Sequence, residues 1–218
     1  MEKKTDFKAL SGKAKVQYIW DYYKLPIFAS IFCIAAAASL IHHYVTYREP
    51  VLNVLMINSI SGPMTTEDGF DEFLDAYGYD KEEFPVSLYG SLYFPEDTQS
   101  AAAADSYQNY EILATMIAAG DNDIFFGTGD TFLSYAEQGA LMDLSKVLSP
   151  EMFEKYEDSM IYSTNSGESD PYPCAIEIKD NSWLKRSGYY DGSCYFGILF
   201  RSENTTAATQ FAEFLLSQ

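Results

Sequence analysis

The sequence predicts an α/β protein in which one transmembrane helix is followed by a single lobe built around a mostly parallel β-sheet. Two observations lead to this fold class. Residues 25–45 contain no Asp, Glu, Lys or Arg, and along residues 50–218 short apolar runs alternate with amphipathic segments. Such alternation is typical of strands covered on both faces by the helices between them and joined by right-handed crossovers. With 218 residues and 47% hydrophobic content, the chain can bury one domain core.

Residues 25–45 are predicted to cross a membrane. As a helix, this segment would extend roughly 31 Å, close to the thickness of the hydrocarbon core of a bilayer. Aromatic residues, which prefer the level of the lipid headgroups, flank it on both sides. They are Tyr18, Trp20, Tyr22, Tyr23, Tyr44 and Tyr47.

The lysines near the N-terminus predict the orientation. Because basic residues stay on the cytoplasmic side, residues 1–24 are expected to be a basic cytoplasmic leader, and residues 50–218 an extracytoplasmic domain of a single-pass cell-membrane protein. The lysines are Lys3, Lys4, Lys8, Lys13, Lys15 and Lys24. Two alternatives remain: a cleaved signal peptide, with its site at the small residues 36–38, and a buried core helix.

Beyond the apolar segment, the first half of the body is predicted to run strand, helix, strand. Residues 51–57 (VLNVLMI) are a short apolar run, as expected of a strand buried on both faces. Thr66 is placed to cap a helix over residues 67–77, whose apolar side chains recur every three or four positions and which Gly78 can end. Residues 85–94 alternate apolar and polar side chains, which predicts a strand.

The next elements repeat this order. Residues 105–119 carry an apolar face at helical spacing, and residues 124–126 form a short apolar run that predicts a buried strand. Asp130 is then expected to cap a helix over residues 131–138.

The last elements follow the same signals. Ser149 precedes a proline and is expected to cap another helix. Residues 173–178 and 195–200 are predicted strands, and residues 205–216 carry one apolar stripe that predicts a final helix.

Charge and composition exclude several functions. Residues 49–218 hold 29 of the 32 Asp and Glu residues but only seven of the 14 Lys and Arg residues, so this body repels phosphate backbones and is not expected to bind nucleic acid. It contains no histidine, which excludes Ser-His-Asp and Cys-His catalysis. Asp121, Asp123 and Asp130 are close in sequence but are read as caps and loop residues, so no enzyme activity is expected.

No cofactor or metal is expected either. Residues 121–123 and 191–192 lack the ligand spacing of a calcium loop. Residues 127–129 lack the longer glycine pattern and the lysine of a phosphate-binding loop. Cys174 and Cys194 can either form a disulfide or remain separate thiols in neighbouring strands.

Ligand-binding residues are expected where strands end, because ligands of open α/β sheets bind at the carboxyl ends of the strands. Two loops qualify, residues 58–62 and 127–130. The predicted ligand-binding residues are Asn58, Ser59, Thr128 and Asp130 in these loops, together with Tyr172. Ordinary turn chemistry is the alternative explanation for all five.

Three segments resemble the type 2 extracellular solute-binding proteins, the receptor components of many ABC importers. They are DIFFG at residues 123–127, FLSYAEQGALMDL at residues 132–144, and GILFRSEN at residues 197–204, which leads into the final helix. The resemblance covers most of residues 50–218 in order. It departs from the family in one respect: only some 20 residues, from about 173 to 195, lie where the second lobe is normally inserted. Tyr172 is selected as a site residue because the resemblance places it near the crossover to that lobe.

The resemblance implies a membrane-anchored, solute-binding-like module without enzymatic activity that assists transport or senses a ligand. The partners it implies are a small solute and an ABC-transporter permease or another membrane protein. The alternative is a protein-interaction or scaffold domain that has kept the fold and lost the small ligand.

Overall fold

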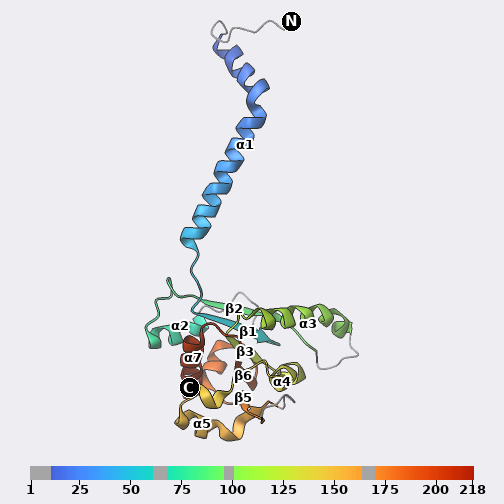
Figure 1. Cartoon of the computed structure of the whole chain (residues 1–218), viewed down its shortest axis with the longest axis vertical. Helices are drawn as coiled ribbons and strands as arrows, with labels where there is room; N and C mark the ends of the chain where they lie inside the picture. Colours follow the sequence, from blue (N-terminus) through green and yellow to red (C-terminus); the bar gives the residue numbers. More distant parts are fainter. Residues whose placement is uncertain (1–10, 61–67, 96–100, 164–169) are drawn as a thin grey trace. The chain divides into compact units, whose positions relative to one another are not determined.

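The computed structural model describes residues 11–60, 68–95, 101–163 and 170–218 (Figure 1). The chain divides into two compact units, an N-terminal unit that ends at Tyr47 and a body, Arg48–Gln218. Thr66, the expected cap of the first helix of the body, lies outside the described residues.

The N-terminal unit is one long helix, α1, Gly12–Thr46. Its part Trp20–Thr46 has a mean hydropathy of 2.0 and is long and apolar enough to cross a membrane, as a membrane anchor or a signal sequence would be. Large apolar side chains such as Phe28 and Phe32 are exposed rather than packed, unlike those of a core helix. Pro26 lies inside the helix, and the Ser30 hydroxyl donates a hydrogen bond to its carbonyl oxygen at 2.8 Å.

Six strands form one sheet in the described part of the body, in the order β2-β1-β3-β6-β5-β4. Strand β1 pairs in parallel with β2 and β3, whereas β6 is antiparallel to β3 and β5, and β4 is antiparallel to β5. The strands are β1 Leu52–Ile57, β2 Val86–Leu92, β3 Ile124–Gly127, β4 Met160–Tyr162, β5 Pro173–Ile178 and β6 Cys194–Ile198.

The α/β class is therefore confirmed, and the sheet is mixed. Four strands run in one direction (β1, β2, β3 and β5), and two run in the other. Residues 179–193, which include α6, connect β5 to β6, and β6 lies beside β5 in the opposite direction.

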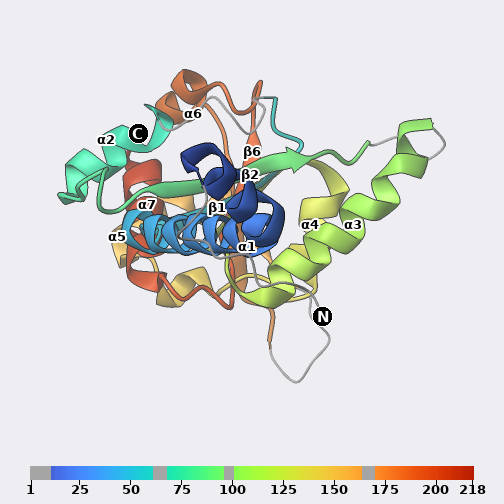
Figure 2. The ribbon, with the colours of Figure 1, turned by 90° about the horizontal axis from the view of Figure 1, so that it is seen from above.

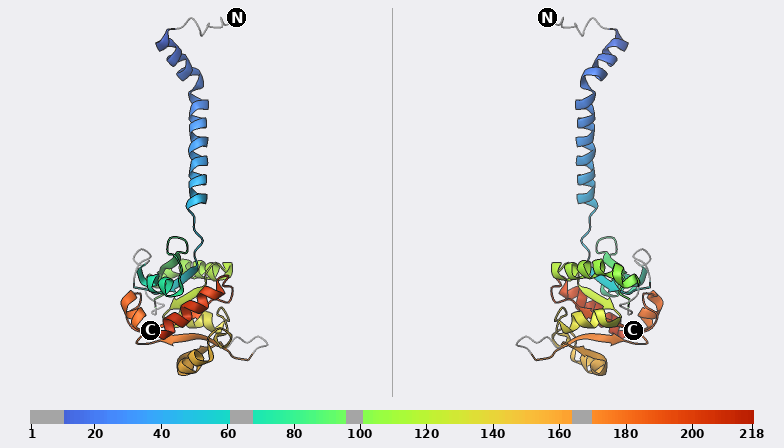
Figure 3. Two further views of the ribbon diagram at one scale, coloured as in Figure 1. Left: turned by 90° about the vertical axis from the view of Figure 1, so that its left-hand side faces the viewer. Right: turned by 90° about the vertical axis from the view of Figure 1, so that its right-hand side faces the viewer.

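Helices cover both faces of the sheet. The helices of the body are α2 Asp68–Tyr77, α3 Ala101–Ala119, α4 Gly129–Glu137, α5 Pro150–Tyr156, α6 Ser182–Ser187 and α7 Thr205–Ser217, with 3-10 turns at Leu144–Lys146 and Glu157–Ser159. Helices α2, α6 and α7 pack on one face, around Phe70, Trp183 and Phe211. Helices α3 and α4 pack on the other face through Leu113 and Phe132. Figure 2 shows α2 and α6 on the opposite side of the body from α3 and α4, and Figures 1 and 3 show α5 at the β5 end of the sheet.

The elements of the body that were predicted from the apolar pattern are present, with ends that differ by at most four residues. One predicted cap is wrong: α4 begins at Gly129 with Thr128 at its N-cap, so Asp130 lies inside the first turn. The helix begins two residues earlier than expected, and Gly129 has φ +76°, a left-handed conformation that favours glycine. The Ser149 cap is confirmed, because its hydroxyl accepts a hydrogen bond from the Met152 N–H at 3.4 Å.

Candidate functional site

The carboxyl ends of β1, β2, β3 and β5 meet at one edge of the sheet, where Ile57, Leu92, Gly127 and Ile178 end their strands. We call this the C-terminal edge. The chain leaves β1 to form β2 on one side and then crosses to form β3 on the other side. Such a reversal of strand order separates the loops that follow the two strands, and ligands of α/β sheets bind at this point.

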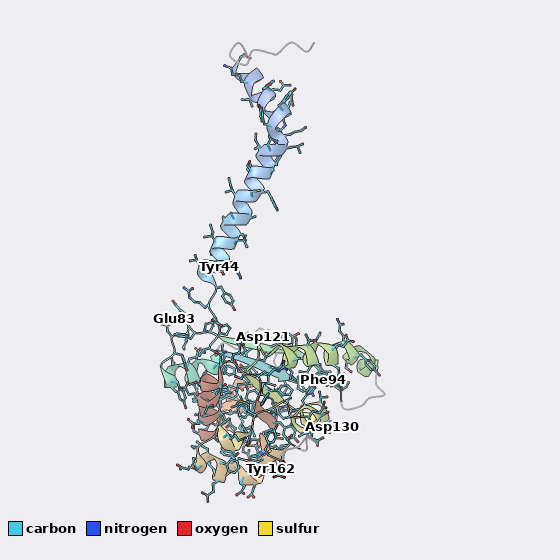
Figure 4. The ribbon with its side chains drawn as sticks, viewed as in Figure 1. Tyr44, Glu83, Phe94, Asp121, Asp130 and Tyr162 are labelled. Carbon is cyan, nitrogen blue, oxygen red and sulfur yellow. The ribbon has the colours of Figure 1, made fainter. Side chains whose placement is uncertain are left out.

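A cavity of about 340 Å³ opens at this position, between the loops after β1 and β3. Its volume lies in the range of small-molecule sites. The described residues that line it are Asn58, Phe94, Pro95, Tyr110, Gly129, Asp130 and Thr131. In Figure 4, which has the view of Figure 1, Phe94 lies just below α3 and Asp130 lies at α4.

Asn58 connects the strand ends that surround the cavity. Its backbone has φ +56°, in the left-handed region that asparagine tolerates better than other residues with a side chain. Its side-chain amide donates to the carbonyl oxygen of Thr128 at 3.2 Å, and its side-chain oxygen accepts from the Phe94 N–H at 2.6 Å. One side chain thus ties together the ends of β1, β2 and β3. Asn58 therefore positions the site more than it faces a ligand.

An aromatic pair forms one wall. The rings of Phe94 and Tyr110 meet edge to face, with centroids 4.7 Å apart. Phe94 is buried, whereas the side chain of Tyr110 is 42% exposed and its hydroxyl lies 3.4 Å from the Thr131 hydroxyl. Sequence reasoning did not select these residues, because both fit the apolar face of a strand or helix. Only the packing of α3 over the end of β2 brings them to the cavity.

The opposite wall is the first turn of α4. Thr128 is half-buried at the N-cap, and its side chain makes no capping bond within the described part of the chain. Asp130 is exposed in the first turn, where a negative charge is favoured by the partial positive charge of the helix N-terminus.

The other two predicted site residues lie elsewhere. The hydroxyl of Ser59 donates to the Gly90 carbonyl oxygen at 2.9 Å, next to β2, and Ser59 is not among the described lining residues. Tyr172 precedes β5, which runs in the same direction as β1, so it lies at the opposite edge of the sheet. There its hydroxyl donates to the Leu141 carbonyl oxygen at 3.2 Å. The structure thus brings together Asn58, Thr128 and Asp130, with Ser59 nearby, but not Tyr172.

Comparisons with models of protein families, with curated proteins and with solved structures find no match for this chain.

The three aspartates that are close in sequence do not form a cluster. Asp121 and Asp123 precede β3, whereas Asp130 follows it, so they belong to opposite edges of the sheet. Asp123 is buried and accepts hydrogen bonds from the Asn53 N–H at 2.8 Å, the Ser202 hydroxyl at 2.7 Å and the Asn204 side-chain amide at 3.1 Å. It therefore connects β1 to the turn before α7. Among the described residues, no group of three or more His, Cys, Asp or Glu side chains is placed to hold a metal.

Cys174 and Cys194 are separate buried thiols that pack into hydrophobic clusters on opposite faces of the sheet. Burial raises the pKa of Cys174 from 9.0 to about 11 and also raises that of Cys194. Both are therefore protonated at neutral pH and unsuited to nucleophilic chemistry.

A second hollow, of about 500 Å³, follows β5 along the same edge. Both of its lysines are paired with carboxylates: Lys179 lies 2.8 Å from Glu177, and Lys185 lies 3.1 Å from Asp180. Neither charge is left for a ligand without breaking an ion pair.

Proposed function

We propose that this protein is a membrane-anchored, extracytoplasmic, non-enzymatic solute-binding-like module that assists transport or senses a ligand. The observation that carries the proposal is the cavity of about 340 Å³ between the loops after β1 and β3. Its place where the strand order reverses is the usual location of ligands in this fold class. The resemblance of residues 123–144 and 197–204 to type 2 extracellular solute-binding proteins supports the same function.

The apolar part of α1 and the lysines before it support the membrane topology. A helix of this hydropathy is stable in a bilayer, and basic residues are retained on the cytoplasmic side. Protease added to intact cells should therefore digest residues 50–218 together with a known surface marker. An alkaline carbonate wash should leave the full chain in the membrane. If the protease digests the surface marker but leaves residues 50–218 intact, this topology is contradicted. If the carbonate wash releases the body from the membrane, the cleaved signal peptide is favoured.

A partner protein is part of the proposal because the body is a single lobe. Residues 179–193, all of them described, form only α6 and its flanking turns, where the resembled family inserts a second lobe. A cavity that only one lobe surrounds leaves much of a bound ligand exposed to water, which weakens binding. An ABC-transporter permease or another membrane protein would then close the cavity.

Ligand binding is tested with the full chain in lipid nanodiscs. Thermal unfolding is followed across a panel of sugars, amino acids, short peptides and amines, and at least one compound should raise the Tm. Tyr110→Ala should abolish the rise. Tyr162→Ala is the matched control, because Tyr162 in β4 is 43% exposed, nearly the same as Tyr110, but lies far along the sheet. A panel without any Tm shift would refute the solute-binding function.

The alternative function, a protein-interaction or scaffold domain, is favoured by one observation. Tyr93 and Tyr107 are 60% and 77% exposed and belong to the same strand end and helix that line the cavity. Exposed tyrosines are enriched where proteins bind one another. Recovery of a specific partner by cross-linking in membranes, lost in Tyr107→Ser, combined with a silent ligand panel would establish this function instead.

A further inference from the structure

The sequence around the cavity lacks positive charge. Between Lys81 and Lys146 there is no lysine or arginine, but there are eleven aspartates and glutamates. This stretch forms β2, α3, β3 and α4, and its residues include every described lining residue except Asn58. All eight Lys and Arg residues beyond residue 47 lie outside residues 82–145.

The two lysines that bound the stretch are already paired. Lys81 lies 2.6 Å from Asp71, and Lys146 lies 2.9 Å from Asp143. Neither residue lines the cavity. Neither lysine therefore neutralises the negative charge of Asp130 at the cavity, and such a charge attracts cations and repels anions.

The lining matches this charge. Asp130 is the one charged side chain among the described residues that line the cavity. Tyr110 presents a partly exposed ring beside it, a surface that attracts an ammonium or guanidinium group. The amide of Asn58 is engaged by Thr128 and Phe94. An anion would have to share the first turn of α4 with the carboxylate of Asp130, so that helix end does not favour it.

We propose that the cavity binds a small organic cation, a ligand with a protonated amine or guanidinium group that pairs with Asp130 and lies against the ring of Tyr110. This inference rests on the proposed solute-binding function and names its ligand class. The cavity volume admits a small molecule of this kind.

The test uses the full chain in lipid nanodiscs and isothermal titration calorimetry. The probes are putrescine, 1,4-butanediol and succinate, which share a four-carbon chain but carry positive, no and negative charge, together with spermidine, agmatine and glucose. Putrescine and the other amines should bind, with an affinity that falls as salt rises, whereas butanediol and succinate should not.

Variants separate the cavity from the acidic surface. Asp130→Asn should weaken amine binding by about tenfold or more, because it removes the charge-assisted hydrogen bond. Asp121→Asn makes the same charge change at the opposite edge of the sheet and should leave binding unchanged. Tyr110→Phe should retain binding, and Tyr110→Leu should weaken it. Cooperative thermal unfolding of each ligand-free variant, with a Tm close to that of the unchanged chain, shows that it remains folded.

The outcomes distinguish the two proposals. Binding of glucose or butanediol as tight as that of putrescine, with no effect of Asp130→Asn, overturns the cationic ligand but keeps the solute-binding function. Equal losses in Asp130→Asn and Asp121→Asn also overturn it, because the amines would then be attracted by the acidic surface as a whole. If none of the probes and none of the compounds in the wider panel binds, both proposals are overturned.

Discussion

Replacing Asp123 by asparagine tests how the body is held together. The two carboxylate oxygens of Asp123 accept hydrogen bonds on both sides. One accepts from the Ser202 hydroxyl at 2.7 Å and the Asn204 N–H at 3.2 Å, and the other accepts from the Asn53 N–H at 2.8 Å and the Asn204 side-chain amide at 3.1 Å. All of these partners donate. Asparagine has only one accepting oxygen, so its NH₂ group must face donors on one side.

The size of the effect follows from that mismatch. The NH₂ group is best placed toward Ser202, because a hydroxyl can turn to accept, and the Asn204 N–H then loses its acceptor. A buried donor without a partner costs about 1 to 3 kcal/mol, and the bonds that remain lose the strength of a charged acceptor. We expect the free energy of unfolding to fall by about 2 to 4 kcal/mol. For a body of this size that corresponds to a Tm lower by roughly 5 to 15 °C.

Thermal unfolding is read from tryptophan fluorescence in the Trp20→Phe background, so that the buried Trp183 reports on the body alone. Asp121→Asn is the matched control, because Asp121 is exposed two residues away and loses the same charge. It should change the Tm by little. Equal Tm values for the two variants would refute the conclusion that Asp123 connects β1 to the turn before α7.

Three further predictions concern packing, pH and thiols. Gly127→Ala should lower the Tm by several degrees in thermal melts, because an added Cβ would lie 2.5 Å from Cγ1 of Ile57. When Ile57→Ala is added to the same chain, the total loss of Tm should be smaller than the sum of the losses in the two single variants. Because burial raises the pKa of Cys174 in the folded chain, its stabilising effect is complete below pH 9 and is lost as the pH rises toward about 11. Urea titrations between pH 9 and pH 11 should show that the free energy of unfolding falls as the pH rises, and that it falls less in Cys174→Ala. An identical fall in both chains would contradict this role of Cys174. In a Cys33→Ala chain, Cys174 and Cys194 should react with Ellman's reagent only after unfolding, and detection of a disulfide between them by mass spectrometry would refute the separate thiols.

The strands that sequence reasoning found are those whose signal is local. Residues 51–57 and 173–178 are apolar runs, and they form β1 and β5 because both faces of those strands are covered by helices. Strand β4 was missed because its three residues, Met160–Tyr162, are too few to show a period.

Helix α6 was missed although its end signals are present. The side chain of Asn181 accepts a hydrogen bond from the Leu184 N–H at 2.9 Å, and Gly188 ends the helix with φ +68°. An asparagine cap and a terminal glycine are the usual end signals of a helix. Six residues carry too little amphipathic pattern to support it, and the helix is fixed by a tertiary contact in which the Trp183 indole N–H donates to the Gly69 carbonyl oxygen at 2.6 Å.

The local sequence pattern does not reveal the direction of a strand, and strand direction decides where one predicted site residue lies. An apolar run has the same sequence whether its strand is parallel or antiparallel, so the reversal of β6 was not visible. Tyr172 was selected because the resembled family has its crossover to a second lobe near residue 173. Because β5 runs with β1, a residue before β5 belongs to the edge away from the cavity.

The difference between local and tertiary signals also separates the residues that position the site from those that contact a ligand. A turn residue after a strand, such as Asn58, is visible in sequence because turns have a typical composition. The hydrogen bonds that make Asn58 necessary at that place also use its side chain within the protein, to Thr128 and Phe94. Contact with a ligand then falls to side chains that the loops and α3 bring together, chiefly Tyr110 and Asp130. Asn58→Ala should therefore lower both the Tm and ligand affinity, whereas Asp130→Asn should lower affinity and reduce the Tm only by the small effect of one charge at the start of α4.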